Sequence, residues 1–258
     1  MGHTASSAST MADVRLLIVS DLHANAGALE SIRETADAVV VLGDIVDYGP
    51  NPHAAIDWAR HYATFAVRGN HDHAVLTGER TGTGPAWADL AEESAAWTRS
   101  VLDSADLAYL NSLPTSLTFS FGGARFAAFH AAPSDPLYRY LPPETAEADW
   151  RAEVERVDAD WLLVGHTHRP LLRKVGSTVV LNPGSVGQPR AGAPFATNAI
   201  WEDGDVLLVQ RRYAVEAVVE RLAATSLGQG THARLARTLR TGEIAGGVPV
   251  RGPHDRSG

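Results

Sequence analysis

The chain has 258 residues, enough for one large domain or two small ones, and its hydrophobic fraction of 45% excludes wholesale disorder. It has no cysteine, which excludes disulfides, thiolate zinc sites and a cysteine nucleophile, whereas 11 histidines favour imidazole and carboxylate chemistry. Its formal net charge of −8 argues against non-specific binding to nucleic acid or to an anionic membrane.

The two ends of the chain differ in composition from its centre. The first ten residues carry no basic cluster, and the apolar run after them is too short for a signal peptide. No apolar run approaches the ~18 residues of a membrane-spanning helix. We therefore expect a cytoplasmic protein with a flexible leader over residues 1–12, one domain over residues 13–245 and a flexible, Gly/Pro-rich tail over residues 246–258. The natural start is either Met1 or Met11.

From residue 14 to about residue 180, apolar runs alternate with helical patterns, which is typical of an α/β protein. In chain order, the pattern predicts a strand at 14–19, a helix at 26–35, a strand at 38–42, a helix at 52–61, a strand at 63–67, a helix at 85–102, a hairpin of 117–121 and 125–129, a helix at 143–157 and strands at 161–164 and 179–181. A second hairpin, 198–201 with 206–213, and helical segments at 215–222 and 233–239 follow.

Side chains that can bind a metal follow directly after these predicted strands, where open α/β sheets collect their ligands. They are Asp21 and His23, then Asp44 and Asp47, then Asn70, His71 and Asp72, then His130, then His166 and His168. Because side chains two apart in extended backbone point the same way, we expect Asp21 with His23, and His166 with His168, to form two clamps. Any single Asp or Asn here could equally cap a helix or turn, but capping does not require histidine at so many strand ends.

These segments resemble the calcineurin-like metallophosphoesterase family, and more narrowly its small bacterial phosphodiesterase-type branch. The matching segments are Asp-Leu-His at 21–23, Gly-Asp-Ile-Val-Asp at 43–47, Gly-Asn-His-Asp at 69–72, His130, Gly-His-Thr-His at 165–168 and Asn-Pro-Gly-Ser-Val-Gly-Gln-Pro-Arg at 182–190. The resemblance spans about residues 14–190. It implies a four-layer α/β/β/α sandwich with a two-metal site at one edge, formed here by a single domain with a C-terminal helical extension.

The resemblance also implies a ligand set. By position, Asp21, His23 and His168 would hold one metal ion, Asn70, His130 and His166 a second, and Asp44 would bridge the two. A bridge suits a carboxylate because it offers two equivalent anionic oxygens. Imidazole and oxygen ligands without thiolate suit two divalent ions of Mn, Fe, Co, Ni or Zn and do not choose among them. Such a pair would activate a hydroxide and leave a cationic pocket in an acidic protein.

His71 lies outside this ligand set, and the resemblance implies that it faces the phosphate, as a proton donor to the leaving oxygen or as a stabiliser of its charge. Asp47 resembles the position that orients this histidine, with Asp72 as the competing partner and turn capping as the alternative for both. Tyr48 stands where Ser/Thr protein phosphatases have Arg, so phosphoprotein phosphatase activity is not expected. Relatives usually carry Gly-Ser where this chain has Ala131 and Ala132.

The expected substrate-binding residues are Asn70, His71 and Arg190. Gln188, Tyr138 and Arg139 are further candidates for the cleft wall, and Asn25 either caps the following helix or reaches the substrate. The tryptophans are assigned to packing. Specificity is expected from loops 77–85 and 134–143, so the physiological substrate is not set by the motifs.

The sequence thus predicts a dinuclear metal-dependent phosphoesterase that hydrolyses phosphodiesters, phosphomonoesters or both. Its partner would be a small phosphorylated substrate, nucleotide-type ones included, with no membrane and no nucleic-acid chain. The alternative is a non-catalytic metal-binding scaffold of the same fold that binds a protein partner, against which the presence of His71 argues. The metal, the ester preference and the oligomeric state stay open.

Overall fold

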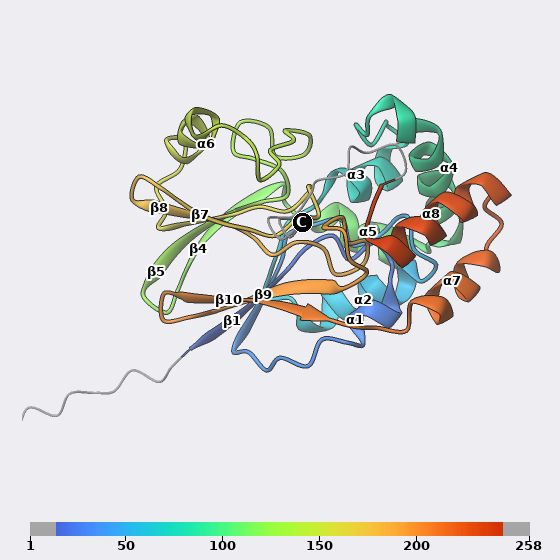
Figure 1. Cartoon of the computed structure of the whole chain (residues 1–258), viewed down its shortest axis with the longest axis horizontal. Coiled ribbons are helices and arrows are strands. Elements are labelled where there is room, and N and C mark those ends of the chain that lie inside the picture. Colours follow the sequence, from blue (N-terminus) through green and yellow to red (C-terminus); the bar gives the residue numbers. More distant parts are fainter. Residues whose placement is uncertain (1–13, 245–258) are drawn as a thin grey trace, which may run out of the picture.

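The computed structural model describes residues 14–244, so the predicted leader and tail lie outside it and the domain limits stay a prediction. The described chain forms two five-stranded mixed sheets (Figure 1). The first has the order β10 (Asp205–Arg211), β9 (Ala196–Glu202), β1 (Arg15–Val19), β2 (Ala38–Val41) and β3 (Phe65–Ala66). The second has the order β4 (Ser116–Phe121), β5 (Ala124–Phe129), β6 (Trp161–Leu163), β8 (Thr178–Asn182) and β7 (Leu171–Val175).

The strands that carry the motifs run parallel within each sheet. β1, β2 and β3 are parallel neighbours, and so are β5, β6 and β8, whereas β9 and β10 in the first sheet and β4 and β7 in the second pair antiparallel to their neighbours. The carboxyl ends of the parallel strands therefore meet at one edge of each sheet.

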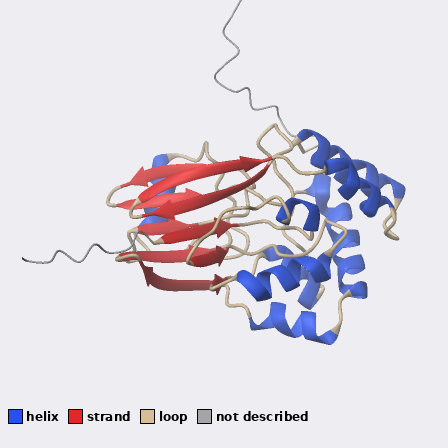
Figure 2. Ribbon diagram, turned by 90° about the horizontal axis from the view of Figure 1, so that it is seen from below, coloured by secondary structure: helices blue, strands red, loops and turns tan. Residues whose placement is uncertain are grey.

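Eight helices surround the sheets in the described residues. They are α1 (Ala26–Leu29), α2 (Pro52–Tyr62), α3 (Asn70–Thr77), α4 (Pro85–Val101), α5 (Ser104–Ser112), α6 (Glu147–Val154), α7 (Val215–Ala223) and α8 (Gln229–Thr241). Figure 2 shows the strands stacked together, with most of the helices gathered beyond one end of them. None of the helices between residues 14 and 244 is long and apolar enough to cross a membrane.

Alternation along the strands divides the apolar side chains between layers. Ile18 on β1 packs with Phe126 and Trp201 in a core between the two sheets. Its neighbour Leu17 points the other way and packs with residues of α2 and α5. On the outer face of the second sheet, Trp150 of α6 is fully buried against the strands. These layers confirm the predicted α/β/β/α sandwich.

The C-terminal helices form a separate apolar cluster with α4. Val218 and Leu222 of α7 pack with Leu235 and Leu239 of α8, and Leu90 joins them from α4. This confirms the predicted C-terminal helical extension, which lies beside α4 rather than on the sheets (Figure 1).

Several predicted boundaries were wrong. Helix 26–35 is only α1, four residues long, because the chain after it must return to the first sheet, where the backbone of Asp37 bonds that of Arg15. Helix 143–157 shortens to α6, and strand 63–67 shortens to β3. The sequence interpretation also missed β7, α3 and α5. α3 was missed because its first residues were assigned to the site alone.

Candidate metal centre

The predicted ligands lie on loops at the carboxyl ends of the parallel strands, but not on extended backbone. Asp21, His23, Asp44, His166 and His168 all have positive φ, between 42° and 65°. The extended backbone on which the two clamps were predicted is therefore absent, although Asp21 and His23 do reach the same group of ligands. His166 and His168 instead reach two different groups of ligands. Left-handed backbone is disfavoured for such residues and is typically retained at functional sites.

The first group joins Asp21, His23, Asp44 and His168, whose ligand atoms all lie within 4.8 Å of one another. The Nε2 atoms of His23 and His168 are 3.2 Å apart. Nε2 of His168 lies 3.2 Å from Oδ1 of Asp21, and Nε2 of His23 lies 3.6 Å from Oδ2 of Asp44. All four residues are buried and come from both sheets.

The hydrogen bonds of the two histidines fix which nitrogen faces this group. Nδ1 of His23 faces the carbonyl of Val46 at 3.3 Å, and Nδ1 of His168 faces that of Gln188 at 2.6 Å. Each Nδ1 must donate there, and burial lowers the pKa of both imidazoles, so both Nε2 atoms carry lone pairs. Both carboxyl oxygens of Asp21 are buried without a hydrogen-bond partner. Burial raises the pKa of Asp21 to about 7 in the metal-free chain, and once ionised this carboxylate faces the two imidazole lone pairs, an arrangement that fits a cation.

The second group joins Asp44, His130 and His166. Nε2 of His130 lies 3.2 Å from Oδ2 of Asp44 and 2.8 Å from Oδ1 of Asn70. The amide of Asn70 donates to the carbonyl of Thr81 at 2.6 Å, which turns its oxygen toward the group. Burial alone would lower the pKa of His130, but the charge and hydrogen bond of Asp44, together with the charge of Asp21, outweigh it and raise that pKa to about 9. Burial lowers the pKa of His166 to about 3.

Asp44 belongs to both groups. Its Oδ1 accepts the backbone N–H of His71 at 2.9 Å, and its Oδ2 has no hydrogen-bond partner and faces both His23 and His130. Although burial opposes it, the positive charge of His130 and His71 holds the pKa of Asp44 well below its usual range. Gly69 is required beside it, because a Cβ there would lie 2.0 Å from Oδ1. The carboxylate is therefore ionised, with one oxygen held and one free.

His71 has one carboxylate partner. Its Nδ1 donates to Oδ2 of Asp47 at 2.6 Å, and Oδ1 of Asp47 accepts the N–H of Tyr48 at 2.7 Å. Burial would lower the pKa of His71, but Asp44 and then Asp47 outweigh it and raise that pKa. The ring of Tyr48 packs against those of His71 and His23, with centroids 4.5 and 4.8 Å away.

Asp72, the competing candidate, is occupied elsewhere. Its Oδ1 accepts the backbone N–H groups of Ile45 and Val46, and its Oδ2 accepts that of Gly69. Asp72 therefore fastens the loop after β2 to the start of α3. Asn25 likewise has the capping role: its oxygen accepts the N–H of Ala28 at 3.0 Å.

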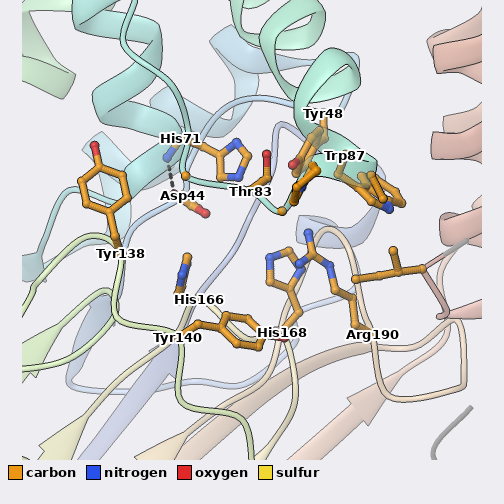
Figure 3. A pocket seen from close by; sticks show the side chains of 15 residues that line it. Asp44, Tyr48, His71, Thr83, Trp87, Tyr138, Tyr140, His166, His168 and Arg190 are labelled. Carbon is orange, nitrogen blue, oxygen red and sulfur yellow. Dashed lines mark hydrogen bonds between the residues drawn. The ribbon is translucent and has the colours of Figure 1, made fainter. Parts of the chain in front are cut away.

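A pocket of about 430 Å³ opens over the two groups (Figure 3). Asp44, His71, His166 and His168 line its inner part, while Arg190 and Trp87 lie on one side of it and Tyr138 on the other. Its further lining residues are Tyr48, Gly82, Thr83, Gly84, Pro85, Ala86, Tyr140 and Ile244. The guanidinium of Arg190 is held by Oε1 of Gln188, at 2.5 and 3.1 Å.

The structure places both predicted loops at the pocket but only some of the predicted residues, since Asn70 and Gln188 do not line it. Both 77–85 and 134–143 contribute to the pocket, and so do Tyr138 and Arg190. Arg139 does not line it and pairs instead with Asp149 and Glu153. Tyr140 was missed, although it lies in a loop already predicted to shape the cleft. Trp87 was assigned to packing alone, but it also lines the wall of the pocket. It lies near the start of a helical pattern, where nothing in the sequence indicates a pocket residue.

Comparisons with known proteins agree with this geometry. A family model described as the calcineurin-like phosphoesterase superfamily domain matches residues 14–203, which contain both ligand groups. An uncharacterised protein of Methanocaldococcus jannaschii is 28% identical over 243 residues, covering 85% of this chain and 96% of that protein. A crystal structure of a metallophosphoesterase from Sphaerobacter thermophilus is 28% identical with a TM-score of 0.74, covering 88% of this chain and 99% of that one.

A hypothetical protein from Pyrococcus horikoshii has the same fold, with a TM-score of 0.78 at 20% identity, and the match covers 90% of this chain and 99% of that one. The family model covers most of the chain and all of the residues that form the two ligand groups. The chain belongs to the calcineurin-like phosphoesterase superfamily, as its motifs predicted.

Proposed function

We propose that the protein is a metal-dependent phosphoesterase that binds two divalent cations and hydrolyses small phosphodiesters, phosphomonoesters or both. The observation that supports this best is the 3.2 Å approach of the Nε2 atoms of His23 and His168 beside the carboxyl of Asp21, while Nδ1 of each ring faces a backbone carbonyl. Burying such a set of acceptors is costly unless a cation satisfies them.

The residues present fit two cations. Asp21, His23 and His168 would hold one, Asn70, His130 and His166 the other, and Asp44 would contact both through its free oxygen. This donor set of imidazole, carboxylate and amide suits Mn, Fe, Co, Ni or Zn. Two bound divalent ions would lower the pKa of water and neutralise charge on a phosphoryl group.

The chain's own residues then supply binding and proton transfer. Asp47 holds Nδ1–H of His71, so the other ring nitrogen of His71 is free to hold a proton for the leaving oxygen. The raised pKa of His71 favours that protonated form. Arg190, which Gln188 holds at the pocket wall, offers the guanidinium that would pair with a phosphoryl oxygen. Asn70, whose Oδ1 lies 2.8 Å from Nε2 of His130, would contact the second cation.

The test is to strip the full chain with chelator, restore Mn²⁺ or Ni²⁺, and assay bis(4-nitrophenyl) phosphate and 4-nitrophenyl phosphate. We expect metal-restored turnover of at least one ester, and its loss in Asp44→Asn. Bound metal without turnover of either ester would contradict the proposal and favour a non-catalytic scaffold.

A further inference from the structure

The pocket is larger than its reacting group requires. Pockets of roughly 300–1,000 Å³ bury whole organic ligands, and this one measures about 430 Å³. A phosphoryl group at the ligand groups would occupy the inner part only. The outer part is therefore available to the organic portion of a substrate.

The wall of that outer part has a distinct chemistry. The charged and imidazole side chains gather at the inner end, around Asp44 and His166 (Figure 3). The loop 82–86 offers glycine, proline and alanine, and its one hydroxyl side chain, that of Thr83, already bonds Thr81. Apart from Arg190 and the hydroxyls of Tyr138 and Tyr140, the outer wall thus offers few side-chain partners for the hydroxyls of a polyol phosphate.

Two tyrosines stand at the rim of this part, and both keep much of their ring surface in solvent. Tyr138 is 36% exposed and Tyr140 is 49% exposed, so they belong to the few large hydrophobic side chains that the described residues leave exposed. Both come from the loop 134–143 and line the pocket. A tyrosine ring offers a rigid flat face at low entropic cost, which suits it for binding planar groups.

Tyr140 lies close to the residues that would bind the reacting phosphoryl group. Its ring centroid is 5.5 Å from that of His166, in an edge-on arrangement. Across the pocket, Trp87 is held from behind by the guanidinium of Arg234, 5.0 Å from its ring centroid. A flat group attached to a phosphoryl oxygen would thus reach aromatic walls without leaving the pocket.

We propose that Tyr138 and Tyr140 form a stacking subsite that selects phosphoesters carrying a planar aromatic group next to the phosphoryl. This rests on the proposed function, since the phosphoryl end must bind at the metal centre. The subsite is a specificity determinant, and its rings contact the substrate without taking part in proton transfer.

The test uses phosphonates, whose C–P bond a phosphoesterase does not hydrolyse, so that binding is measured apart from turnover. The Mn²⁺-loaded full chain is titrated calorimetrically with benzylphosphonate, cyclohexylmethylphosphonate and methylphosphonate. We expect benzylphosphonate to bind about tenfold more tightly than methylphosphonate, with cyclohexylmethylphosphonate in between. Tyr140→Ala should remove most of that preference and Tyr140→Phe should keep it, while the affinity for methylphosphonate stays unchanged.

Tyr62→Ala is the matched control, because Tyr62 is similarly exposed, at 52%, and does not line this pocket. Equal binding of the three phosphonates by the unaltered chain would overturn the subsite, and so would a preference that survives both Tyr138→Ala and Tyr140→Ala. Equal affinities for benzylphosphonate and cyclohexylmethylphosphonate would show that the subsite is only an apolar wall. That result would overturn the proposal that the tyrosine rings stack on the substrate. The expected binding pattern without hydrolysis of any ester would leave the subsite standing and contradict the proposed function instead; no binding of any phosphonate would contradict both.

Discussion

In the proposed function, the pairing of His71 with Asp47 separates proton transfer from metal binding at the level of single side chains. His71 donates its backbone N–H to Asp44, while its ring bonds Asp47. The backbone thus supports the carboxylate that both ligand groups share, and the side chain is left for the substrate. Removing the ring should therefore affect turnover without emptying the metal centre.

We predict that His71→Asn lowers kcat by about 10²- to 10⁴-fold because a positioned proton donor is lost. Asp47→Asn should also lower kcat, since the asparagine amide would orient the ring of His71 less strongly than the carboxylate does. Metal content, measured by elemental analysis, should stay at the unaltered level in both. His73→Asn is the control, because His73 lies on the same helix and pairs with Glu79 at its surface. Full activity of His71→Asn would contradict this assignment.

The residues that form the two candidate ligand groups could be predicted from the sequence, but their conformations could not. Each ligand follows an apolar strand within a short motif, so local pattern is enough to find it. The positive φ of Asp21 and His23 depends instead on the N–H groups of these residues, which bond the carbonyls of Gly43 and Asp44 in a distant loop. Tyr140 was missed for a similar reason, because only the folded loop brings its ring beside His166.

At the scale of elements, α1 is held by its cap rather than by its length. Four residues cannot sustain a helix on their own. Asn25 accepts the N–H of Ala28 and donates to the carbonyl of Gly187 at 2.8 Å, so one side chain joins the start of α1 to the loop after β8. That second bond is between residues 162 apart in sequence, which no local pattern could predict.

We predict that Asn25→Ala lowers the free energy of unfolding by about 1–3 kcal/mol, because both the cap and the buried bond to Gly187 are lost. Asn25→Ser should cost less, since serine can still cap the helix but cannot reach the carbonyl in the same way. Urea denaturation of the metal-free chain measures both. Equal stability of the two variants would show that the link to Gly187, and not the cap, carries the effect; no loss in either would contradict both roles.

Elements with strong apolar periodicity were predicted well. Segments whose course is set by the return of the chain to a sheet were not. α2 and α4 differ from their predicted limits by one residue at one end. Residues 30–37 have apolar positions that suit a helix, yet Ile32 packs onto the core from irregular chain. The pairing of this segment with β1 decides its course. The backbone N–H of Asp37 donates to the carbonyl of Arg15, and the carboxylate of Asp37 accepts the N–H of Arg15.

At the scale of the whole molecule, the candidate metal centre is built from both sheets. The loops after β1 and β2 supply Asp21, His23 and Asp44, the start of α3 after β3 supplies Asn70, and the loops after β5 and β6 supply His130, His166 and His168. Neither sheet alone holds a complete group of ligands. Since the unfolded chain has no such site, cations that bind the folded centre should also stabilise the two-sheet sandwich.

The most direct test of this account is the number of cations that the folded chain binds. After removal of metal by chelator, calorimetric titration with Mn²⁺, confirmed by elemental analysis, should give two ions per chain. His168→Ala should lose at least one of them. His53→Ala should keep both, because His53 with Asp103 and Asp106 forms a largely exposed group in which Asp103 caps α5. Absence of stoichiometric binding, or unchanged binding in His168→Ala, would contradict the central claim.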